Sequence, residues 1–318
     1  MNEIDNLGQD ARTVPELVED AKEVLEWAKA LGVRIGNDNW IQHIINKMER
    51  ILVEPSEEEK RKRFLRLYSN PIESQNNIAD MVHLGFMRRH IGEQDNKILC
   101  AKLFLALRGA DSVRQETPAN TKSRDARYEL SMCARLNERG YSSNLAEPNP
   151  DIWVKRKNIK AAIECKRVYS SQGIERRLIE GWKQLRNRPA INGADLHVIF
   201  CDITRAFTDG QKHLQGLADD VLKELQGKLY QQSTDIIKLL ERNCASEVDA
   251  VVLTYQDYIE PVQSDYVLRG ITQQLVIINS GRWRNGGVMV PRQRRRLALK
   301  FFKNLDHKGK ILYEDSYR

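Results

Sequence analysis

The hydrophobic pattern changes once along the chain, and this change limits the possible folds more than any other feature. From Val14 to about Gly109, apolar residues recur at three- and four-residue intervals, as in amphipathic helices. A polar stretch at 110–123, which contains Pro118, separates them from alternating or continuously apolar runs that are typical of strands. We therefore expect an all-helical N-terminal domain at 1–115 and an α/β domain at 116–318, in which helices flank a mixed sheet.

Turn and capping residues bound the N-terminal helices. In the first helix, Thr13 is the expected N-cap, Pro15 lies in the first turn and Gly32 ends the helix. Its core-facing stripe is predicted to contain Leu17, Ala21, Leu25 and Ala28. Further helices are expected at 39–52, 56–68, 78–89 and 96–107. No residue of this region stands out as catalytic.

The α/β domain is expected to begin with a helix at 124–139 that ends at Gly140 and is followed by a stretch rich in turn formers. Two strands, at 151–155 and 159–168, are joined by a short basic turn at Lys157 and Asn158. The remaining elements are predicted as a helix at 173–188, a strand at 196–203, a helix at 219–242, and strands at 250–255 and 273–278.

The strand expected at 159–168 carries the residues with the clearest chemistry. Its alternation directs Ile159, Ala161, Ile163 and Cys165 to one face and Lys160, Ala162, Glu164 and Lys166 to the other. A hairpin would pair it with the preceding strand, which begins at Asp151 after Pro150. The carboxylates of Asp151 and Glu164 are therefore expected to converge, with the Lys166 ammonium beside them.

Two carboxylates and a lysine in this arrangement suit phosphodiester hydrolysis. Mg²⁺ or Mn²⁺ can lower the pKa of a bound water and stabilise charge on the phosphoryl oxygens. Mg²⁺ needs only one or two protein carboxylates, so Asp151 and Glu164, with the backbone carbonyl of Cys165, are the predicted ligands. Lys166 is predicted to orient the attacking water, to offset developing charge or to take part in proton transfer.

Pro150-Asp151 and Glu164-Cys165-Lys166 together resemble the motif of the PD-(D/E)XK nuclease superfamily, which shares the core of restriction endonucleases. The resemblance covers about 124–203. It implies a restriction-endonuclease-like fold, metal-dependent endonuclease activity on DNA more often than RNA, and a setting such as defence against foreign DNA. It also matches Glu129 to a glutamate near the metal and Gln184 to a polar site residue of the following helix. Arg188, however, stands where a familiar variant has tyrosine.

Charge and composition point to the partners and the compartment. The formal charge is +7, with acidic residues crowding the first helix and basic ones the C-terminal segment, where Arg294, Arg295 and Arg296 are predicted to contact phosphates. The same arginines also fit a solvated helix face. The cysteines form no metal-binding spacing, which favours a reduced, cytoplasmic compartment, and no segment is apolar enough for a membrane.

Alternative interpretations stay open at this point. The chain could be a nucleic-acid-binding module that does not cut, or an interaction protein that recruits a partner, or a second copy, through its N-terminal helices. Asp151 could be a turn residue, and Glu164 with Lys166 an exposed strand pair. Glu129 and Gln184 could be surface residues. For three others we expect structural roles, in the core or in packing: His197, Trp153 and Trp182.

Overall fold

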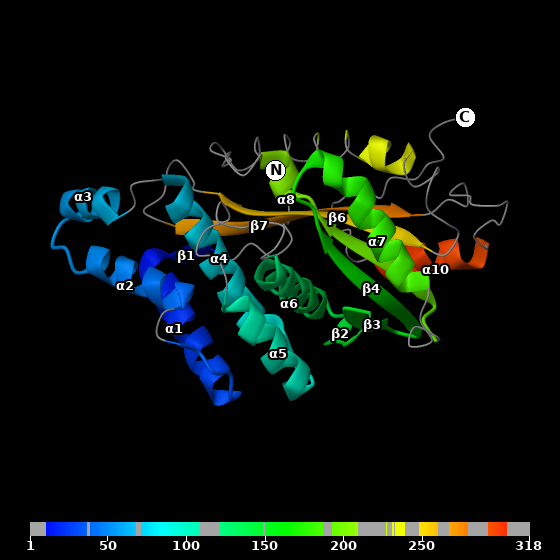
Figure 1. Ribbon diagram of the computed structural model, residues 1–318, viewed down its shortest axis with the longest axis horizontal. Coiled ribbons are helices and arrows are strands. Elements are labelled where there is room, and N and C mark those ends of the chain that lie inside the picture. Colours follow the sequence, from blue (N-terminus) through cyan, green and yellow to red (C-terminus); the bar gives the residue numbers. More distant parts are fainter. Residues whose placement is uncertain are drawn as a thin grey trace.

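The computed structural model describes residues 11–36, 39–67, 71–108, 121–148, 150–186, 193–208, 227, 231, 233–238, 248–259, 267–278 and 292–303. A seven-stranded mixed sheet in the order β1-β7-β6-β5-β4-β3-β2 runs through the molecule, with the N-terminal helices gathered at one end (Figure 1). The mixed α/β architecture with a helical N-terminal region is therefore confirmed.

The N-terminal helices lie close to their predicted positions. They are α1 (Val14–Ala30), α2 (Trp40–Leu52), α3 (Glu57–Leu67), α4 (Pro71–His90) and α5 (Asn96–Ala106). Thr13 caps α1 through a capping box with Glu16, and the predicted stripe of α1 is buried. The start predicted for α4, at 78, was wrong. Pro71 begins the helix, because its fixed φ suits a first turn, and polar residues such as Glu73 and Asn76 hid the helical periodicity.

The N-terminal region is not purely helical. The short strand β1 (Ala11–Thr13) pairs antiparallel with β7 (Val267–Ile278), at the edge of the sheet. Its three residues carry no alternation that could be recognised locally, and its partner lies more than two hundred positions away in the sequence. The expectation of an all-helical region is corrected accordingly, because β1 belongs to the central sheet.

The α/β part starts with α6 (Lys122–Glu138), which ends before Gly140, a residue with φ of 75°. The strand β2 (Ser142–Leu145) follows in the stretch for which only turns were expected. The other elements are β3 (Ile152–Arg156), β4 (Ile159–Arg167), α7 (Ile174–Arg186), β5 (Leu196–Asp202), α8 (Thr204–Thr208), β6 (Ala250–Ile259), β7 and α10 (Arg292–Phe302). Most of the helix predicted at 219–242 lies outside the described residues, and 233–238 are helical.

Strand directions explain the mixed character of the sheet. β4, β5 and β6 run parallel, whereas β2, β3 and β4 form an antiparallel meander and β7 is antiparallel to both β6 and β1. The turn between β3 and β4 contains Lys157 with φ of 51°, as tight hairpins require. The site described below lies on this β3–β4 hairpin.

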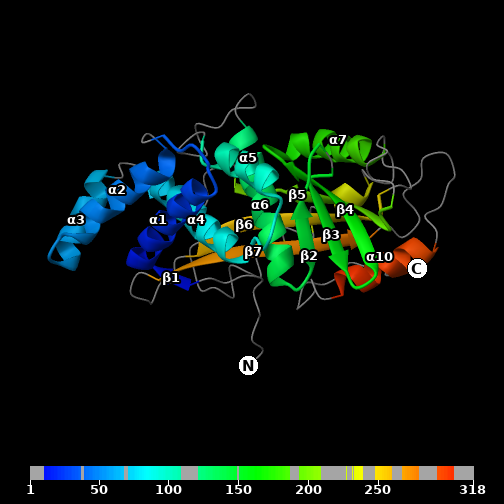
Figure 2. The ribbon, with the colours of Figure 1, turned by 90° about the horizontal axis from the view of Figure 1, so that it is seen from below.

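Two layers of apolar side chains cover the two faces of the sheet. Figure 2 shows α7 and α10 on opposite sides of the strands. On one face, α6 and α10 pack on residues such as Ile163 and Phe200; on the other, α7 packs on Ala162 and Ile199. The alternation predicted for β4 is thereby confirmed. Trp153 and Trp182 also belong to the α7 layer, so their predicted packing role is confirmed as well.

The N-terminal helices share one continuous core with the sheet. Buried residues of α1, α2, α4 and α5 belong to the same apolar cluster as α6, β3 and β4. Asp80 of α4 accepts hydrogen bonds from Arg124 and Arg127 of α6, and Gly85 lets α4 approach α1 so closely that a Cβ would meet Asp20. The boundary predicted near residue 115 lies outside the described residues. No described helix is both long and apolar enough to cross a lipid bilayer.

Candidate active site

The β3–β4 hairpin brings the predicted acids together. Ile152 pairs with Ile163, so the preceding Asp151 lies beside Glu164. The Asp151 carboxylate is fixed by the backbone N–H of Cys165, which donates to its Oδ2 at 2.7 Å. The side chains of Asp151 and Glu164 therefore converge where the end of β4 meets the start of β3.

The ammonium of Lys166 lies between these oxygens. Its Nζ donates to Glu164 Oε2 at 2.9 Å and to the Cys165 carbonyl at 3.1 Å, and it lies 3.8 Å from Asp151 Oδ2. The three oxygen groups predicted as metal ligands thus surround one positive charge. This is not an exposed strand pair, because Glu164 is 0% exposed and Lys166 is buried.

Burial makes Glu164 hard to ionise. Desolvation, with the nearby charge of Asp151, raises the pKa of Glu164 to about 8, although Lys166 opposes the rise. Burial also disfavours the charged form of Lys166, but the charges of Glu164 and Asp151 outweigh it and raise the pKa of this ammonium. Oε1 of Glu164 is buried without a hydrogen-bond partner. Once Glu164 has lost its proton, this oxygen can accept a cation at little further desolvation cost.

Glu129 faces the same cluster from α6. Its carboxylate is buried, and desolvation with the charge of Asp151 raises the pKa of Glu129 to about 7. Its partner is Lys102 of α5, whose Nζ lies 2.5 Å from Glu129 Oε2. The contact is a close ion pair, and it opposes the rise in the pKa of Glu129.

Lys102 was not foreseen from the sequence. In the segment ILCAKLFLA it is a single charge with apolar neighbours on both sides, and such a lysine is usually read as one that reaches solvent. The signal that could have found it is its position one place before the buried Leu103 and three after Leu99, on the apolar face of α5. The structure places it in the cluster with Glu129.

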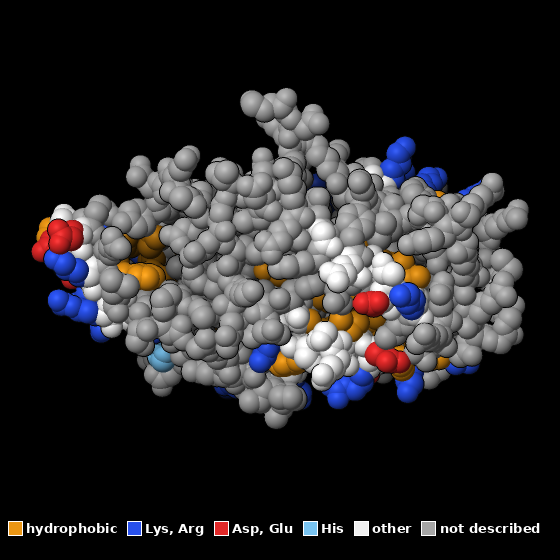
Figure 3. Space-filling model, turned by 90° about the horizontal axis from the view of Figure 1, so that it is seen from above, with side chains coloured by type: hydrophobic (Ala, Val, Ile, Leu, Met, Phe, Trp, Pro, Cys, Tyr) orange, Lys and Arg blue, Asp and Glu red, His pale blue; other side chains and the backbone are white. Residues whose placement is uncertain are grey.

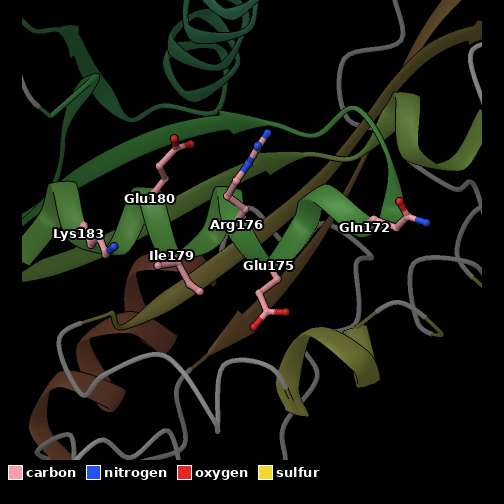
Figure 4. A pocket seen from close by; sticks show the side chains of 6 residues that line it. All are labelled: Gln172, Glu175, Arg176, Ile179, Glu180 and Lys183. Atoms are coloured by element: carbon pink, nitrogen blue, oxygen red, sulfur yellow. The ribbon is translucent and has the colours of Figure 1, made fainter. Parts of the chain in front are cut away.

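Gln184 stands apart from these contacts. It is half-buried on α7, whose buried face is formed instead by Leu178, Gly181, Trp182 and Leu185, and its side chain makes no hydrogen bond to a described residue. α7 also borders a pocket lined by Gln172, Glu175, Arg176, Ile179, Glu180 and Lys183 (Figure 4). This pocket includes neither Asp151 nor Glu164, and its charges are mixed, so we assign it no chemistry.

The arginine run of α10 divides into different environments. Arg294 is tied into the fold, because its Nη2 lies 2.6 Å from Oδ2 of Asp249, a residue that is only 1% exposed and also accepts from the N–H of His197. This internal ion pair gives Arg294 a structural role. The phosphate contacts predicted for Arg294, for the half-buried Arg295 and for the exposed Arg296 stay predictions.

On one face of the molecule, the charged side chains of the described residues are scattered. Figure 3 shows a few acidic and basic side chains near one another on this face, without a large patch of one sign among the described residues. No broad anionic or cationic platform can thus be assigned on this face from the residues that the structure describes.

The acids fit a sparse metal site rather than a complete protein cage. Within the described ranges, no group of three or more His, Cys, Asp or Glu side chains is placed to hold a metal ion. Asp151, Glu164 and the Cys165 carbonyl instead provide two carboxylates and one neutral oxygen, with Glu164 Oε1 unpaired. That donor set suits Mg²⁺, which keeps several waters and takes few protein ligands.

Comparisons with known proteins add no further assignment. No protein-family model, no curated protein and no solved structure matches this chain. The functional argument therefore rests on the residues and geometry described above.

Proposed function

We propose that this chain is a metal-dependent nuclease that hydrolyses phosphodiester bonds, with DNA as the preferred substrate. The supporting observation is the convergence of Asp151, Glu164 and the Cys165 carbonyl on the Lys166 ammonium. Holding the buried Glu164 and Lys166 beside Asp151 is costly, because each ion loses hydration, and such clusters are concentrated at functional sites.

In this proposal, Asp151, Glu164 and the Cys165 carbonyl hold Mg²⁺ or Mn²⁺, and Glu129 lies nearby as a water-mediated ligand. The bound ion would supply Lewis-acid stabilisation of the phosphoryl oxygens and a more acidic water. The Cys165 N–H orients Asp151. Lys166, which already donates to oxygen atoms, is placed to donate to a phosphate oxygen or to orient the attacking water.

The resemblance of Asp151 and Glu164-Cys165-Lys166 to the PD-(D/E)XK motif supports the same reaction class and a restriction-endonuclease-like fold. Defence against foreign DNA is a setting that follows only from this analogy. Arg295 and Arg296 are the proposed phosphate contacts of the C-terminal helix.

The decisive test is cleavage of plasmid, linear and single-stranded DNA, and of RNA, with Mg²⁺, with Mn²⁺ or with EDTA. We expect cleavage with either metal, none with EDTA, and none for Glu164→Gln. Glu180→Gln is a matched control, because Glu180 is an exposed acid of α7 away from the cluster. Binding of nucleic acid without cleavage under any of these conditions would instead establish a non-cutting module.

A further inference from the structure

Lys102 brings a positive charge into the candidate site from a segment outside the motif. It lies on α5, in the N-terminal region, and its side chain is almost as inaccessible as that of Lys166. Its Nζ lies 2.5 Å from Glu129 Oε2 and 3.4 Å from Glu147 Oε1. An ammonium in such surroundings is stable only when a carboxylate balances its charge.

Glu129 is the main partner of Lys102. The Glu147 side chain is about half exposed, so water screens its charge, whereas that of Glu129 is buried. The ion pair also holds the Glu129 carboxylate in place across the α5–α6 contact. Asp151 acts on both members, because its charge favours the ammonium of Lys102 and disfavours the carboxylate of Glu129.

The two buried glutamates therefore each have a lysine. Lys166 pairs with Glu164 from within the motif, and Lys102 pairs with Glu129 from the N-terminal helices. A divalent cation that enters between these acids brings charge of the same sign as the two ammonium groups already present. Over a few ångströms inside a protein, such repulsion is strong.

We propose that Lys102 is the internal counter-cation of the metal site: it positions Glu129 in the metal-free protein and lowers the affinity for the divalent cation by charge competition. This inference rests on the proposed function, since it concerns the same site. It makes the N-terminal helices part of the site, because α5 supplies a charge that sets metal loading.

The test is calorimetric Mn²⁺ binding to the full chain. Lys102→Gln and Lys102→Met remove the charge, and the first keeps a hydrogen-bond donor for Glu129. Both should bind Mn²⁺ at least about tenfold more tightly at about pH 8.5, where protons compete less for the carboxylates. Lys102→Arg keeps the charge and should stay close to the unmodified protein. Lys97→Gln, on the exposed side of the same helix, should not change the affinity.

A merely structural role for Lys102 predicts that the neutral variants bind Mn²⁺ more weakly, since a loosened site binds metal less well. Equal or weaker Mn²⁺ binding by the folded neutral variants would overturn the inference. If these variants fold only with Mn²⁺ present, the metal has replaced the ammonium, and the inference is supported. If Mn²⁺ does not rescue their folding, the inference is overturned. Cleavage by the unmodified protein is measured separately, so loss of the nuclease proposal is distinguished from loss of this one.

Discussion

At the scale of single residues, the site is defined by acids that resist ionisation. The pKa of Glu164 is raised to about 8 and that of Glu129 to about 7, in both cases chiefly by burial. A metal ligand must be deprotonated, so protons and the metal compete for Glu164. The apparent Mn²⁺ affinity should rise as pH increases from about 6 to 8, with proton release on binding.

Calorimetry in two buffers of different ionisation enthalpy directly measures the protons that are released when Mn²⁺ binds. The Glu164→Gln variant should no longer bind Mn²⁺. The Glu180→Gln variant should show the same pH dependence of Mn²⁺ affinity as the unmodified protein. A flat affinity across this pH range would show that Glu164 is not a ligand.

The carboxyl group of Glu164 should also make the stability of the metal-free protein depend on pH. Because the pKa of Glu164 rises from 4.5 in the unfolded chain to about 8 in the fold, the folded state binds more protons between these values. Stability should therefore fall as pH rises from about 4.5 to 8, by a few kcal/mol in order of magnitude. Glu164→Gln cannot ionise, so its urea-unfolding free energy in EDTA should depend less on pH. An equally steep dependence in this variant would assign the titration to other groups.

Lys166 has a different task from the acids. Lys166→Ala removes a donor and no metal ligand, so Mn²⁺ binding should survive while the cleavage rate falls by ~10²-fold or more if the lysine serves in proton transfer. Asp151→Ala should lose cleavage and metal binding together. Calorimetry and a cleavage time course on the same variants separate these roles. Unimpaired cleavage by folded Lys166→Ala would remove the lysine from the mechanism.

At the scale of elements, the local sequence pattern was sufficient to predict a strand with alternating apolar residues or a helix with capping residues. The hairpin of β3 and β4 was predictable from the alternation around Ile163 and from the turn at Lys157 and Asn158. β2 was not, because its residues Ser142–Leu145 are mostly polar and their pairing with β3 decides their conformation. β1 was hidden for the same reason, since its partner is distant in the sequence.

In the C-terminal helix α10, one arginine of the basic run also has a structural role. Arg294 neutralises Asp249, whose pKa burial still raises to about 6. Arg294→Ala should destabilise the fold by ~3–5 kcal/mol, since it leaves a buried charge unpaired. Arg296→Ala should leave stability almost unchanged and flatten the salt dependence of DNA binding by close to one unit of slope if it contacts a phosphate.

Urea unfolding and a DNA-binding salt series measure these two effects. The double variant Arg294→Ala/Asp249→Asn is the control, because it removes both charges and should recover part of the lost stability. If Arg294→Ala proves as stable as the unmodified protein, the ion pair contributes little.

At the scale of the whole molecule, the motif residues could be predicted but their surroundings could not. Asp151, Glu164 and Lys166 lie within sixteen positions of one another, so a single hairpin brings them together. Lys102 reaches Glu129 only because α5 packs on α6, and no local pattern contains that contact. Gln184, inferred from family resemblance alone, has no hydrogen bond that links it to the acids.

The shared core predicts that the α/β part does not fold independently. α6 is buried both against the sheet and against α4 and α5, whose side chains Met81, Phe86, Met87, Leu99 and Leu103 are almost fully buried. Each such side chain contributes about 1.5–3 kcal/mol. Losing the burial of several such side chains removes much of the net stability of a typical domain, which is ~5–15 kcal/mol. A fragment of residues 116–318 should therefore lack a cooperative thermal transition.

Circular dichroism melting and proton NMR dispersion of this fragment, beside the full chain, measure the effect. The fragment should also fail to bind Mn²⁺, because without the helices that share its core it does not fold and the β3–β4 hairpin is not held against α6. A sharp unfolding transition together with intact Mn²⁺ binding would show the opposite, that the helical region is a separate module and that the site is complete without it.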